Sequence, residues 1–537
     1  MKLSKSEIAE PRMWDKADIE LPQFDLEKMI EATKENPTWV HFGSGNIFRG
    51  FIAALQQELL NSGKSKTGII AAETFDYEII DRIYEPYDNL NLLVLMEPDG
   101  SLKKKVIASV AESLVGDTSR KSHWGRLEDI FLKESLQMVS FTVTEKGYSL
   151  TDISGNYLPR VINDFESGPR APEHLISKIA ALSYKRYKNG KLPIAFVSMD
   201  NCSHNGDVLK KAILTVVRNW VDNEHVEKEF LEYLKDPEKV SFPWTMIDKI
   251  TPRPSEKIKD DLNKIGFEST SILCTDKNTF IAPFVNAEVP QYLVVEDHFP
   301  NGRMPLELSG ALFTDRKTVD MVEKMKVTTC LNPLHTALAV FGCLLDYRLI
   351  ADEMKDKHLK KLIEKIGYKE GMPVVVNPEI IDPKDFIDEV INKRLKNPFI
   401  PDSPQRIATD TSQKVGIRFG ETIKTYAYHS NLRAVDLEFI PLAIAGWLRY
   451  LLGVNDKGEK IKLSPDPMLN ELQRYLDGIE LGDVSFASDK LKPILSNEKL
   501  FGINLYNVGL AQKIDEYFRE MIKGKNAVRD VLEKYVG

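Results

Sequence analysis

The sequence predicts an α/β fold, with a doubly wound N-terminal domain followed by a mostly α-helical domain. Through roughly the first 300 residues, short apolar segments alternate with amphipathic helical stretches, which is typical of a mainly parallel sheet covered by helices. After about residue 308, helical periodicity dominates. The turn-rich segment 297–305 is the expected junction, so we predict domains of residues 1–306 and 307–537.

Five short apolar segments predict the strands of the sheet. Helical stretches at 48–61 and 206–222 follow two of them, as expected for parallel strands joined by helices. In such sheets, ligands bind outside the carboxyl ends of the strands, so binding residues are expected there. The predicted strands are residues 38–42, 67–72, 90–96, 137–143 and 193–198.

Helical spacing of apolar residues recurs through the C-terminal part of the chain. Apolar side chains three and four positions apart share one face of a helix, which predicts helices that pack on one another. The predicted helices are residues 317–325, 334–351, 355–366, 384–394, 434–453, 466–476 and 508–535.

Composition and charge exclude several classes of protein. The 72 basic and 80 acidic residues are spread along the chain and give a net charge of −8, without the basic stripe typical of nucleic-acid binding. The first residues lack the apolar core of a signal peptide, and no apolar run is long enough to span a membrane. We therefore expect a cytoplasmic protein with a small-molecule partner and neither a nucleic-acid nor a membrane partner.

The cysteines and histidines argue against disulfides and metal sites. Cys202, Cys274, Cys330 and Cys343 lie in apolar segments without CxxC spacing, so we predict reduced thiols in the core. The nine histidines include no metal-ligand spacing such as HExxH, so no metal site is predicted.

A glycine-rich turn follows the first predicted strand. Gly43 and Gly45 let the backbone turn tightly and approach a pyrophosphate, which the N-terminus of the next helix would favour. The third glycine of the dinucleotide-binding pattern is displaced to Gly50, and an ordinary glycine turn is the alternative interpretation. Glu73 and Asp76, after the second strand, predict hydrogen bonds to an adenosine ribose and therefore NAD rather than NADP. The alternative is an ordinary acidic strand end.

The segment from Lys326 to His335 carries the most chemistry. Asn332 is a good N-cap and Pro333 suits a first helical position, so a helix is expected to begin here with His335 in its first turn. The helix dipole would keep the imidazole neutral and favour nearby negative charge, as on a carbonyl that is becoming an alkoxide. The alternative is a capped core helix with a satisfied His335 and an exposed Lys326.

Polar residues also follow the strand predicted at 193–198. The segment from Asp200 through Asn201 to Gly206 lies where doubly wound sheets place catalytic groups. A simple turn made by Asn and Gly is the alternative interpretation.

Together these segments resemble the polyol-specific long-chain dehydrogenases, the family of mannitol dehydrogenase and fructuronate reductase. The similarity runs from residue 41 to at least 337 and thins after Arg418. It implies an NAD-dependent oxidoreductase with a Rossmann-like domain, a helical C-terminal domain and no catalytic metal. The segments that carry it are residues 43–49, 142–148, 200–206, 242–252, 296–303 and 326–335.

The resemblance also implies which residues bind the cofactor and which act in catalysis. Asn201 and Asn332 would donate hydrogen bonds to the substrate oxygen as it gains negative charge, and His335 would orient it. Lys326 would deliver or remove the proton. The residues implied to bind the cofactor are Gly43, Gly45, Asn46, Phe48, Arg49, Glu73 and Asp76.

The catalytic lysine departs from the family spacing. The family places it five residues before the asparagine, a position occupied here by Val327, and Lys326 lies one residue earlier. We predict that 325–331 is an extended segment with a one-residue bulge that brings Lys326 into place. Lys324 is the alternative acid/base and would share the face of Lys326.

The substrate class follows from the closest branch of the family. Chain length and the segment 330–335 are most similar to the fructuronate reductase branch, which implies interconversion of D-mannonate and D-fructuronate. A hexonate needs a cation for its carboxylate, and Arg418, Arg433 and Lys249 are candidates. The alternatives are mannitol 2-dehydrogenase, a related polyol or ketose enzyme, or tagaturonate reductase. Outside this class, the alternative is a catalytically inactive NAD- or sugar-binding protein.

Overall fold

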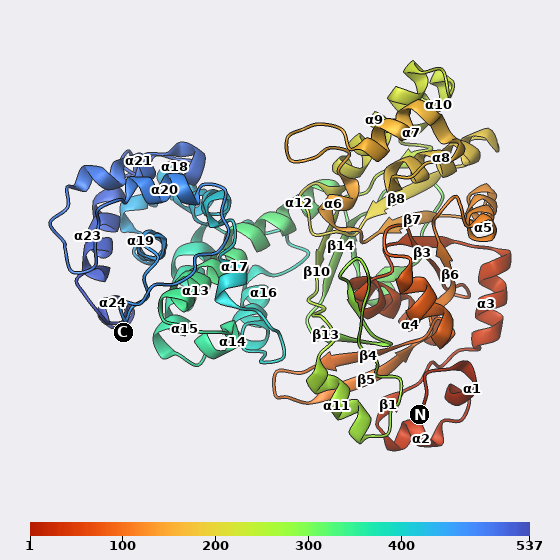
Figure 1. Ribbon diagram of the computed structural model, residues 1–537, viewed down its shortest axis with the longest axis horizontal. Coiled ribbons are helices and arrows are strands. Elements are labelled where there is room, and N and C mark those ends of the chain that lie inside the picture. Colours follow the sequence, from red (N-terminus) through yellow and green to blue (C-terminus); the bar gives the residue numbers. More distant parts are fainter. The chain divides into compact units, whose positions relative to one another are not determined.

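The computed structural model describes residues 1–537, apart from the side chain of Ser488. The chain folds into two compact units (Figure 1). The division falls within helix α12 (Arg316–Met325), later in the chain than the 306/307 boundary expected from the sequence. The first unit contains Met1–Glu97 and Ser101–Asp320, and the second contains Pro98–Gly100 and Met321–Gly537.

A six-stranded sheet forms the centre of the first unit. Its order is β6-β3-β2-β7-β8-β9, and every neighbouring pair is parallel. This is the order of a doubly wound dinucleotide-binding fold, with its switch point between β2 and β7. The predicted fold class is therefore confirmed. The strands are β2 (Trp39–Phe42), β3 (Ile69–Glu73), β6 (Val110–Val115), β7 (Met138–Phe141), β8 (Ile194–Ser198) and β9 (Val240–Ser241).

Alternate residues of the central strands face two separate apolar layers. Val40 and Phe42 of β2 belong to the layer that contains helices α5, α8 and α9, whereas Trp39 belongs to the layer of η1 and α4. Both faces of the sheet are thus buried, as the continuous apolar strands predict. The bounds are α5 (Lys121–Leu132), α8 (Leu175–Lys188), α9 (Asn205–Asp222), the π-helical η1 (Phe48–Ile52) and α4 (Ala53–Asn61).

The strand predicted at 90–96 exists but lies in a different sheet. It is β4, in a four-stranded mixed sheet of order β1-β5-β4-β13. An apolar run does not show which sheet a strand joins, because a strand buried on both faces has the same sequence pattern in either sheet.

A third sheet has the order β10-β14-β15, and β11 and β12 form a separate pair. The bounds are β1 (Ile19–Glu20), β4 (Asn91–Met96), β5 (Leu102–Ile107), β10 (Thr245–Asp248), β11 (Leu273–Cys274), β12 (Phe280–Ile281), β13 (Phe284–Glu288), β14 (Tyr292–Glu296) and β15 (Leu312–Thr314). The other helices of this unit are α1 (Lys5–Ile8), α2 (Arg12–Lys16), α3 (Leu26–Glu35), α6 (Thr144–Tyr148), α7 (Pro159–Ser167), α10 (Lys228–Lys235) and α11 (Glu256–Lys264).

The second unit is helical, as predicted. Every residue of α19 is buried, and α19 packs closely on α13, because a Cβ at Gly446 would lie 2.7 Å from the ring of Phe341. The single helix predicted at 508–535 is instead two helices, α23 and α24, and the one predicted at 334–351 ends at Leu344. The bounds are α13 (Asn332–Leu344), α14 (Ile350–Glu353), α15 (Lys357–Glu364), α16 (Pro383–Glu389), α17 (Pro404–Ile407), α18 (Glu421–Tyr428), α19 (Phe439–Leu451), α20 (Leu469–Tyr475), α21 (Lys492–Leu495), α22 (Glu498–Phe501), α23 (Ala511–Met521) and α24 (Ala527–Val536).

A buried carboxylate caps the N-terminus of α19. Glu370 accepts hydrogen bonds from the backbone nitrogens of Glu438, Phe439 and Ile440 at 2.5, 2.8 and 2.7 Å. These nitrogens have no partner inside the helix, so the carboxylate removes the cost of burying them.

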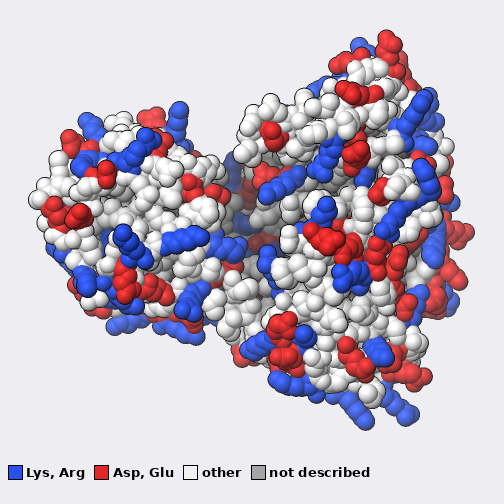
Figure 2. Space-filling view, viewed as in Figure 1, with Lys and Arg blue, Asp and Glu red and all other residues white. Residues whose placement is uncertain are grey.

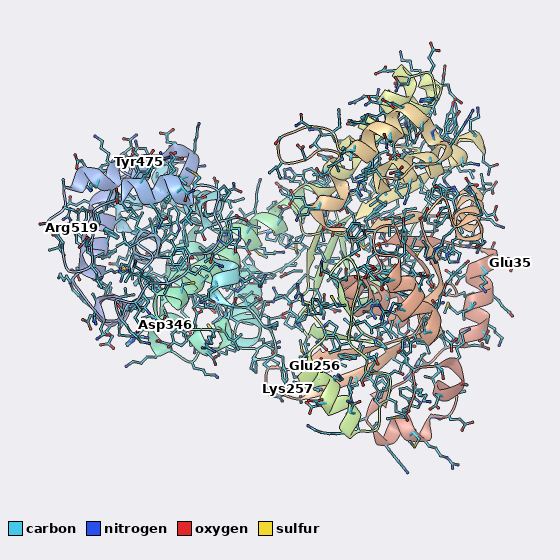
Figure 3. The ribbon with its side chains drawn as sticks, in the orientation of Figure 1. Glu35, Glu256, Lys257, Asp346, Tyr475 and Arg519 are labelled. Atoms are coloured by element: carbon cyan, nitrogen blue, oxygen red, sulfur yellow. The ribbon has the colours of Figure 1, made fainter. Side chains whose placement is uncertain are left out.

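Charged side chains lie on the surface of each unit. Acidic and basic groups are interspersed on the faces seen in Figure 2, without a basic stripe there. Among the residues labelled in Figure 3, Arg519 pairs with Asp515 at 2.9 Å, and Tyr475 donates to Glu471 at 3.0 Å. One helical stretch, Arg316–Leu344, is long and apolar enough to cross a membrane, but 78% of that apolar window is buried inside the protein.

Candidate active site

The glycine-rich turn after β2 contains two glycines with different roles. Gly43 has a φ of +101°, and a Cβ there would lie 2.2 Å from the carbonyl oxygen of Thr142, so packing against the end of β7 requires glycine. A Cβ at Gly45 would meet no described atom within 4 Å. The protein's own packing therefore does not require Gly45, which leaves open space for a ligand against the backbone.

The same turn offers polar groups to an anion. Among the described atoms, the buried hydroxyl of Ser44 has no hydrogen-bond partner. The helix that continues into η1 and α4 begins at Asn46, so its first N–H groups lie beside the turn. Open space at Gly45, an unsatisfied hydroxyl and a helix N-terminus fit the pyrophosphate of a dinucleotide.

The side chains of Phe48 and Arg49 make contacts within the protein, and their role in binding the cofactor stays a prediction. Phe48 is fully buried and stacks on the ring of His41 at 4.1 Å. Arg49 is 1% exposed and donates to the carbonyl oxygen of Ala282 at 2.7 Å and to Asn46 at 2.8 Å. These contacts fix the start of the helix against its surroundings.

Glu73 holds the glycine-rich turn and the end of β3 together. Its carboxylate accepts hydrogen bonds from the backbone nitrogens of Ser44, Thr74 and Phe75 at 2.9–3.0 Å, and from that of Asp76 at 3.4 Å. Burial raises the pKa of the Glu73 carboxyl, and these hydrogen bonds oppose the increase. Glu73 is thus engaged by the protein's own backbone, and a contact with ribose stays a prediction.

Asp76 lies deeper than predicted. It is 2% exposed, and it accepts a hydrogen bond from the hydroxyl of Thr275 at 2.6 Å. This contact attaches the turn after β3 to the β11–β12 segment. Asp76 is therefore engaged within the protein, and a contact with ribose stays a prediction.

Asn201 lies exposed in a turn that is fixed at both ends. Asp200 accepts from the backbone nitrogens of Val143 and Thr144, each at 2.9 Å. Asn205 donates to the carbonyl oxygens of Asp200 and Thr245, each at 3.0 Å. The turn after β8 is thus rigid, and it presents Asn201 at the carboxyl end of the sheet, as predicted.

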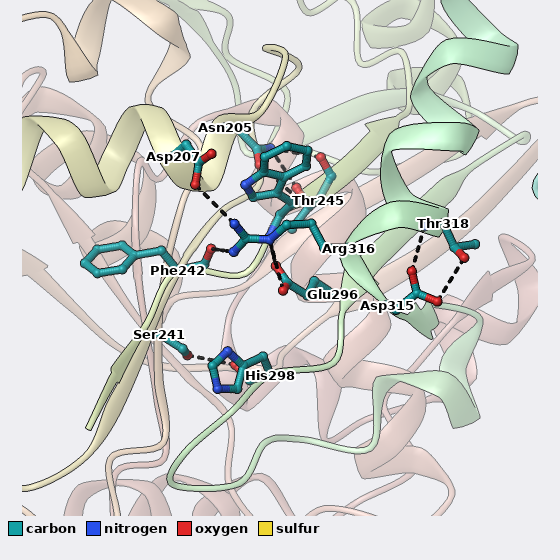
Figure 4. Close-up of polar contacts among 11 residues, drawn as sticks. Asn205, Asp207, Ser241, Phe242, Thr245, Glu296, His298, Asp315, Arg316 and Thr318 are labelled. Atoms are coloured by element: carbon teal, nitrogen blue, oxygen red, sulfur yellow. Dashed lines mark hydrogen bonds and ion pairs between the residues drawn. The ribbon is translucent and has the colours of Figure 1, made fainter. Parts of the chain in front are cut away.

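Polar contacts of Arg316 anchor helix α12 to Glu296 and to Asp207 of α9, the helix that follows this turn (Figure 4). Arg316, the first residue of α12, donates to Glu296 at 3.0 Å, pairs with Asp207 at 3.3 Å and lies 4.9 Å from the Trp244 ring. His204 stacks on the same ring at 4.1 Å. The helix that leads to Lys326 thus begins at a fixed point beside the Asn201 turn.

Lys326 begins a π-helical turn and not an extended segment. This turn, η6 (Lys326–Cys330), joins α12 to α13, so the prediction that 325–331 is extended was wrong. The backbone nitrogen of Leu331 donates to the carbonyl oxygen of Lys326 at 3.1 Å, an i+5 contact. Such a turn accommodates one extra residue within a helix, so the predicted bulge occurs in helical form. Lys326 itself is 3% exposed.

Lys324 does not share the surroundings of Lys326. It lines a cavity of about 290 Å³ with Thr328, Thr329 and Thr422, and Lys326 is not part of that lining. The two lysines would share a face in a strand but not in a helix, where residues two apart point in different directions. The surroundings of the two lysines therefore differ more in the structure than the sequence predicted.

Asn332 is not the N-cap of α13. The N-cap is Leu331, with φ −130° and ψ −62°, and Asn332 is the first residue of the helix. Because η6 leads directly into α13, this helix end is not a free N-terminus. Pro333 lies in the first turn, as predicted, and the carbonyl oxygen of Asn332 accepts from the hydroxyl of Thr336 at 2.9 Å.

His335 is a neutral imidazole in a positively charged environment. Burial lowers its pKa to about 4, and Arg418, Arg406 and Arg394 add to this decrease. Asp402 opposes it from 3.5 Å. The neutrality predicted from the helix dipole is thus present, but burial is its main cause.

Arg418 lies beside His335 in the second unit. Its guanidinium donates to the hydroxyl of Thr336 at 2.6 Å, and burial lowers its pKa to about 10. Throughout the described part of the chain, no carboxylate lies within ion-pair distance of it. Most of its five N–H donors remain for a ligand.

The other two candidate cations for a substrate carboxylate have local partners. Arg433 has 75% of its side chain exposed and pairs with Asp436 at 2.7 Å. Lys249 donates to the carbonyl oxygen of Glu288 and to the side chain of Gln291. Both side chains have these contacts within the protein, and their role as substrate ligands stays a prediction.

Comparison with known proteins agrees with this geometry. The family model "Mannitol dehydrogenase Rossmann domain" matches residues 37–303, and the model "Mannitol dehydrogenase C-terminal domain" matches residues 318–522. A D-mannonate oxidoreductase of Thermotoga maritima is 54% identical over 539 residues, which cover 100% of this chain and 99% of that protein. The chain belongs to the mannitol dehydrogenase family. The resemblance noted from the sequence is thereby confirmed.

More distant members of the mannitol dehydrogenase family also match along most of the chain. A D-mannonate oxidoreductase of Escherichia coli is 28% identical over 476 residues, covering 87% of this chain and 89% of that protein. The structure of Pseudomonas fluorescens mannitol 2-dehydrogenase, a ternary complex with NAD and D-mannitol, superposes with a TM-score of 0.70 at 25% identity. It covers 99% of each chain.

The cysteines of this mannitol dehydrogenase family member are only partly in the core. Cys330 and Cys343 are buried, and burial raises the pKa of each thiol to about 12. Cys202 is half-buried and Cys274 is exposed, so the prediction of four core thiols was wrong for these two. Among the described residues, no group of three or more His, Cys, Asp or Glu side chains is placed to hold a metal ion.

Sequence analysis missed the residues that surround His335. Asp402, Arg406 and Arg394 come from segments far along the chain, and only the fold brings them to α13. Their one signal was the run Pro401-Asp402-Ser403-Pro404, a turn before a short helix with a polar side chain at its start.

Proposed function

We propose that this protein is an NAD-dependent oxidoreductase that interconverts D-mannonate and D-fructuronate. The 54% identity with the T. maritima D-mannonate oxidoreductase over the whole chain supports the substrate. The NAD complex of the P. fluorescens enzyme and the open turn at Gly45 support the cofactor. The reaction is a reversible hydride transfer at a secondary alcohol. The predicted cytoplasmic location and small-molecule partner belong to the same proposal.

The environment of Arg418 is the observation that supports a sugar acid as the substrate rather than a neutral polyol. A half-buried guanidinium without a carboxylate partner in the described structure favours a ligand that supplies one. Arg406 and Arg394 add positive charge around His335, against the single carboxylate of Asp402. A substrate carboxylate would balance this charge, and a bidentate contact to Arg418 would fix its orientation. A polyol could accept hydrogen bonds from the guanidinium but would leave its positive charge without a counter-charge.

The cofactor-binding turn would hold the pyrophosphate through backbone N–H groups and the hydroxyl of Ser44, with Gly45 allowing close approach. Bound NAD supplies the hydride acceptor, and bound NADH supplies the donor. Glu73 keeps the turn in shape through its four hydrogen bonds.

The protein's side chains would handle the substrate oxygen. Asn332, together with Asn201, donates amide hydrogen bonds to the oxygen when it carries negative charge. Lys326 accepts the hydroxyl proton during oxidation and returns it to the oxygen during reduction. Burial of Lys326 keeps bulk water from this proton. The roles of Lys326, Asn332, His335 and Asn201 rest on the match to the family motif.

A substrate panel tests the proposed function. Oxidation of NADH, followed by its absorbance, is measured with D-fructuronate, D-tagaturonate and D-fructose. The highest kcat/KM is expected with D-fructuronate. A higher value with D-fructose would assign the chain to the polyol enzymes. Binding of NADH without turnover of any substrate would indicate a binding protein that is not a catalyst.

A further inference from the structure

His335 has a neighbour that the proposed mechanism does not use, the carboxylate of Asp402. Oδ2 of Asp402 lies 3.5 Å from Nε2 of His335, longer than a well-formed hydrogen bond. Nε2 is buried, and no described atom makes a hydrogen bond with it. The side chain of His335 keeps 15% of its surface exposed. Since Nε2 contributes none of that exposure, Nδ1 is the ring nitrogen left for a ligand.

Asp402 is held in place from two other directions. Its Oδ1 forms an ion pair with Arg406, whose side chain is 61% exposed, and its backbone oxygen accepts from the nitrogen of Ile350 at 2.9 Å. Asp402 is 8% exposed. One carboxylate oxygen is therefore neutralised from the solvent side, while the other faces the imidazole.

The tautomer of His335 follows from this arrangement. A neutral imidazole carries one N–H, and the other nitrogen is an acceptor. A carboxylate has no hydrogen to donate, so a nitrogen that faces it is stabilised as the N–H. The other charged groups facing the ring are Arg418, Arg406 and Arg394, which are all cations and favour the neutral ring.

We propose that Asp402 is a positioning residue that holds His335 in the Nε2–H tautomer, so that Nδ1 accepts a hydrogen bond from a hydroxyl of the substrate. The identity of that hydroxyl as one of a sugar acid rests on the proposed function, but the tautomer does not. His335 then recognises a hydroxyl donor, and it does not donate to the oxygen that gains negative charge. The amides of Asn332 and Asn201 carry that task alone.

The direct test is nitrogen NMR of the imidazole in the protein without substrate. The chain has nine histidines, so the signal of His335 is assigned by its loss in His335→Gln. We expect the shifts of an Nε2–H tautomer at pH 7 and a change of tautomer in Asp402→Asn, whose amide can present N–H to Nε2. An Nδ1–H tautomer in the unaltered protein would overturn the proposal.

Kinetics provide the second readout. Exchanging an orienting aspartate for asparagine in serine proteases keeps the geometry, selects the wrong tautomer and lowers kcat by about 10⁴. We expect kcat/KM for D-fructuronate to fall by at least about 10²-fold in Asp402→Asn and to recover partly in Asp402→Glu. Asp352→Asn, the matched control, makes the same exchange in a surface pair with Lys355 and should change kcat/KM little.

The outcomes separate this proposal from the proposed function. An Nε2–H signal that is lost in Asp402→Asn, with no turnover of sugar acids by the unaltered protein, would support the positioning role and reject the function. Full kcat/KM in Asp402→Asn and Asp402→Ala, with an unchanged ring signal, would reject the positioning role whichever substrate is used. If Asp402→Ala does not fold, Asp402→Glu and the unaltered protein still give the tautomer.

Discussion

The backbone nitrogen of Leu331 donates to the carbonyl oxygen of Lys326 at 3.1 Å, across five residues instead of the four of an α-helix. This contact closes the π-helical turn between Lys326 and Asn332. Single π turns within helices are frequent at functional sites. Here the turn explains how a lysine six residues before the asparagine can replace one at the family spacing of five.

Lys326 is predicted to be the acid/base. Lys326→Ala and Lys326→Met should lower kcat by at least about 10²-fold, because the proton loses its carrier. NADH affinity, measured by fluorescence titration, should change less than about twofold, since the turn at Gly45 is untouched. Lys324→Ala is the control, because Lys324 lines a separate cavity. A severe loss of kcat in Lys324→Ala, together with an active Lys326→Ala, would assign the acid/base role to Lys324.

The π turn itself is open to a deletion experiment. Deleting Val327 restores the five-residue spacing and should let α12 continue into α13 as α-helix. Because the turn would no longer need an extra residue, we expect kcat within about tenfold of the original. Deleting Ala337, which is fully buried within α13, should abolish both folding and activity. An inactive, well-folded Val327 deletion would show that the π geometry is itself required.

The two glycines of the turn should respond differently to a methyl group. Gly45→Ala adds a Cβ to open space, so the melting temperature should stay unchanged while NAD affinity falls. Gly43→Ala forces a Cβ to 2.2 Å from Thr142 at a φ of +101°, so stability should drop by more than about 1 kcal/mol. Calorimetry measures the stability of each variant, and NADH titration measures its affinity for the cofactor. Equal NAD affinity in Gly45→Ala and the original would place the pyrophosphate elsewhere.

Arg418 should determine preference for acids over polyols. A hydrogen bond to a charged group contributes about 1.5–3 kcal/mol, so Arg418→Gln should raise KM for D-fructuronate by roughly 10- to 100-fold. Activity with D-fructose should change little by comparison. Arg433→Gln, at an exposed ion pair with Asp436, is the matched control and should behave like the original. Equal effects of the two substitutions would rule out a specific carboxylate contact.

Glu353 should make stability depend on pH. It is fully buried beside Gly342, and its carboxylate oxygens have no hydrogen-bond partner among the described atoms. Burial raises its pKa well above the ordinary value of 4.5, so its contribution to stability is complete below about pH 4.5 and declines as the pH rises through the folded-state pKa.

Glu353→Gln removes this titration. The melting temperature of the variant relative to the original should therefore increase between pH 5 and pH 8. Asp352→Asn, on the same helix but in a surface pair with Lys355, is the control and should show no such trend. A constant difference between Glu353→Gln and the original would mean that Glu353 does not titrate on unfolding.

Much of the first unit could be predicted from the sequence because its signals are local. The strands at 38–42, 67–72, 137–143 and 193–198 all occur in the central parallel sheet, since apolar runs bounded by turns form strands in many contexts. The glycine-rich turn could be predicted because the positive φ of Gly43 is a local backbone requirement that glycine meets. The sheet that receives β4 was not predictable, because strand partners are chosen by tertiary packing.

The candidate site was predicted less completely, and the errors share one cause. Phe48 and Arg49 belong to a motif, but only the packing of η1 shows that they are buried. A β-branched run such as Val327-Thr-Thr329 favours a strand by propensity, and its neighbouring helices α12 and α13 impose a helical turn instead. Asp402 has no motif at all. Contacts between distant segments therefore decided each of these cases.

The charged groups with the largest effect on His335 all come from residues after Met321. Arg394, Asp402, Arg406 and Arg418 all lie in the second unit, whereas the glycine-rich turn and Glu73 lie in the first. The charges proposed to select the substrate and the turn proposed to bind the cofactor therefore lie in separate stretches of the sequence. Substitutions confined to residues 390–420 could therefore change the proposed preference for acids while every residue of the glycine-rich turn is kept.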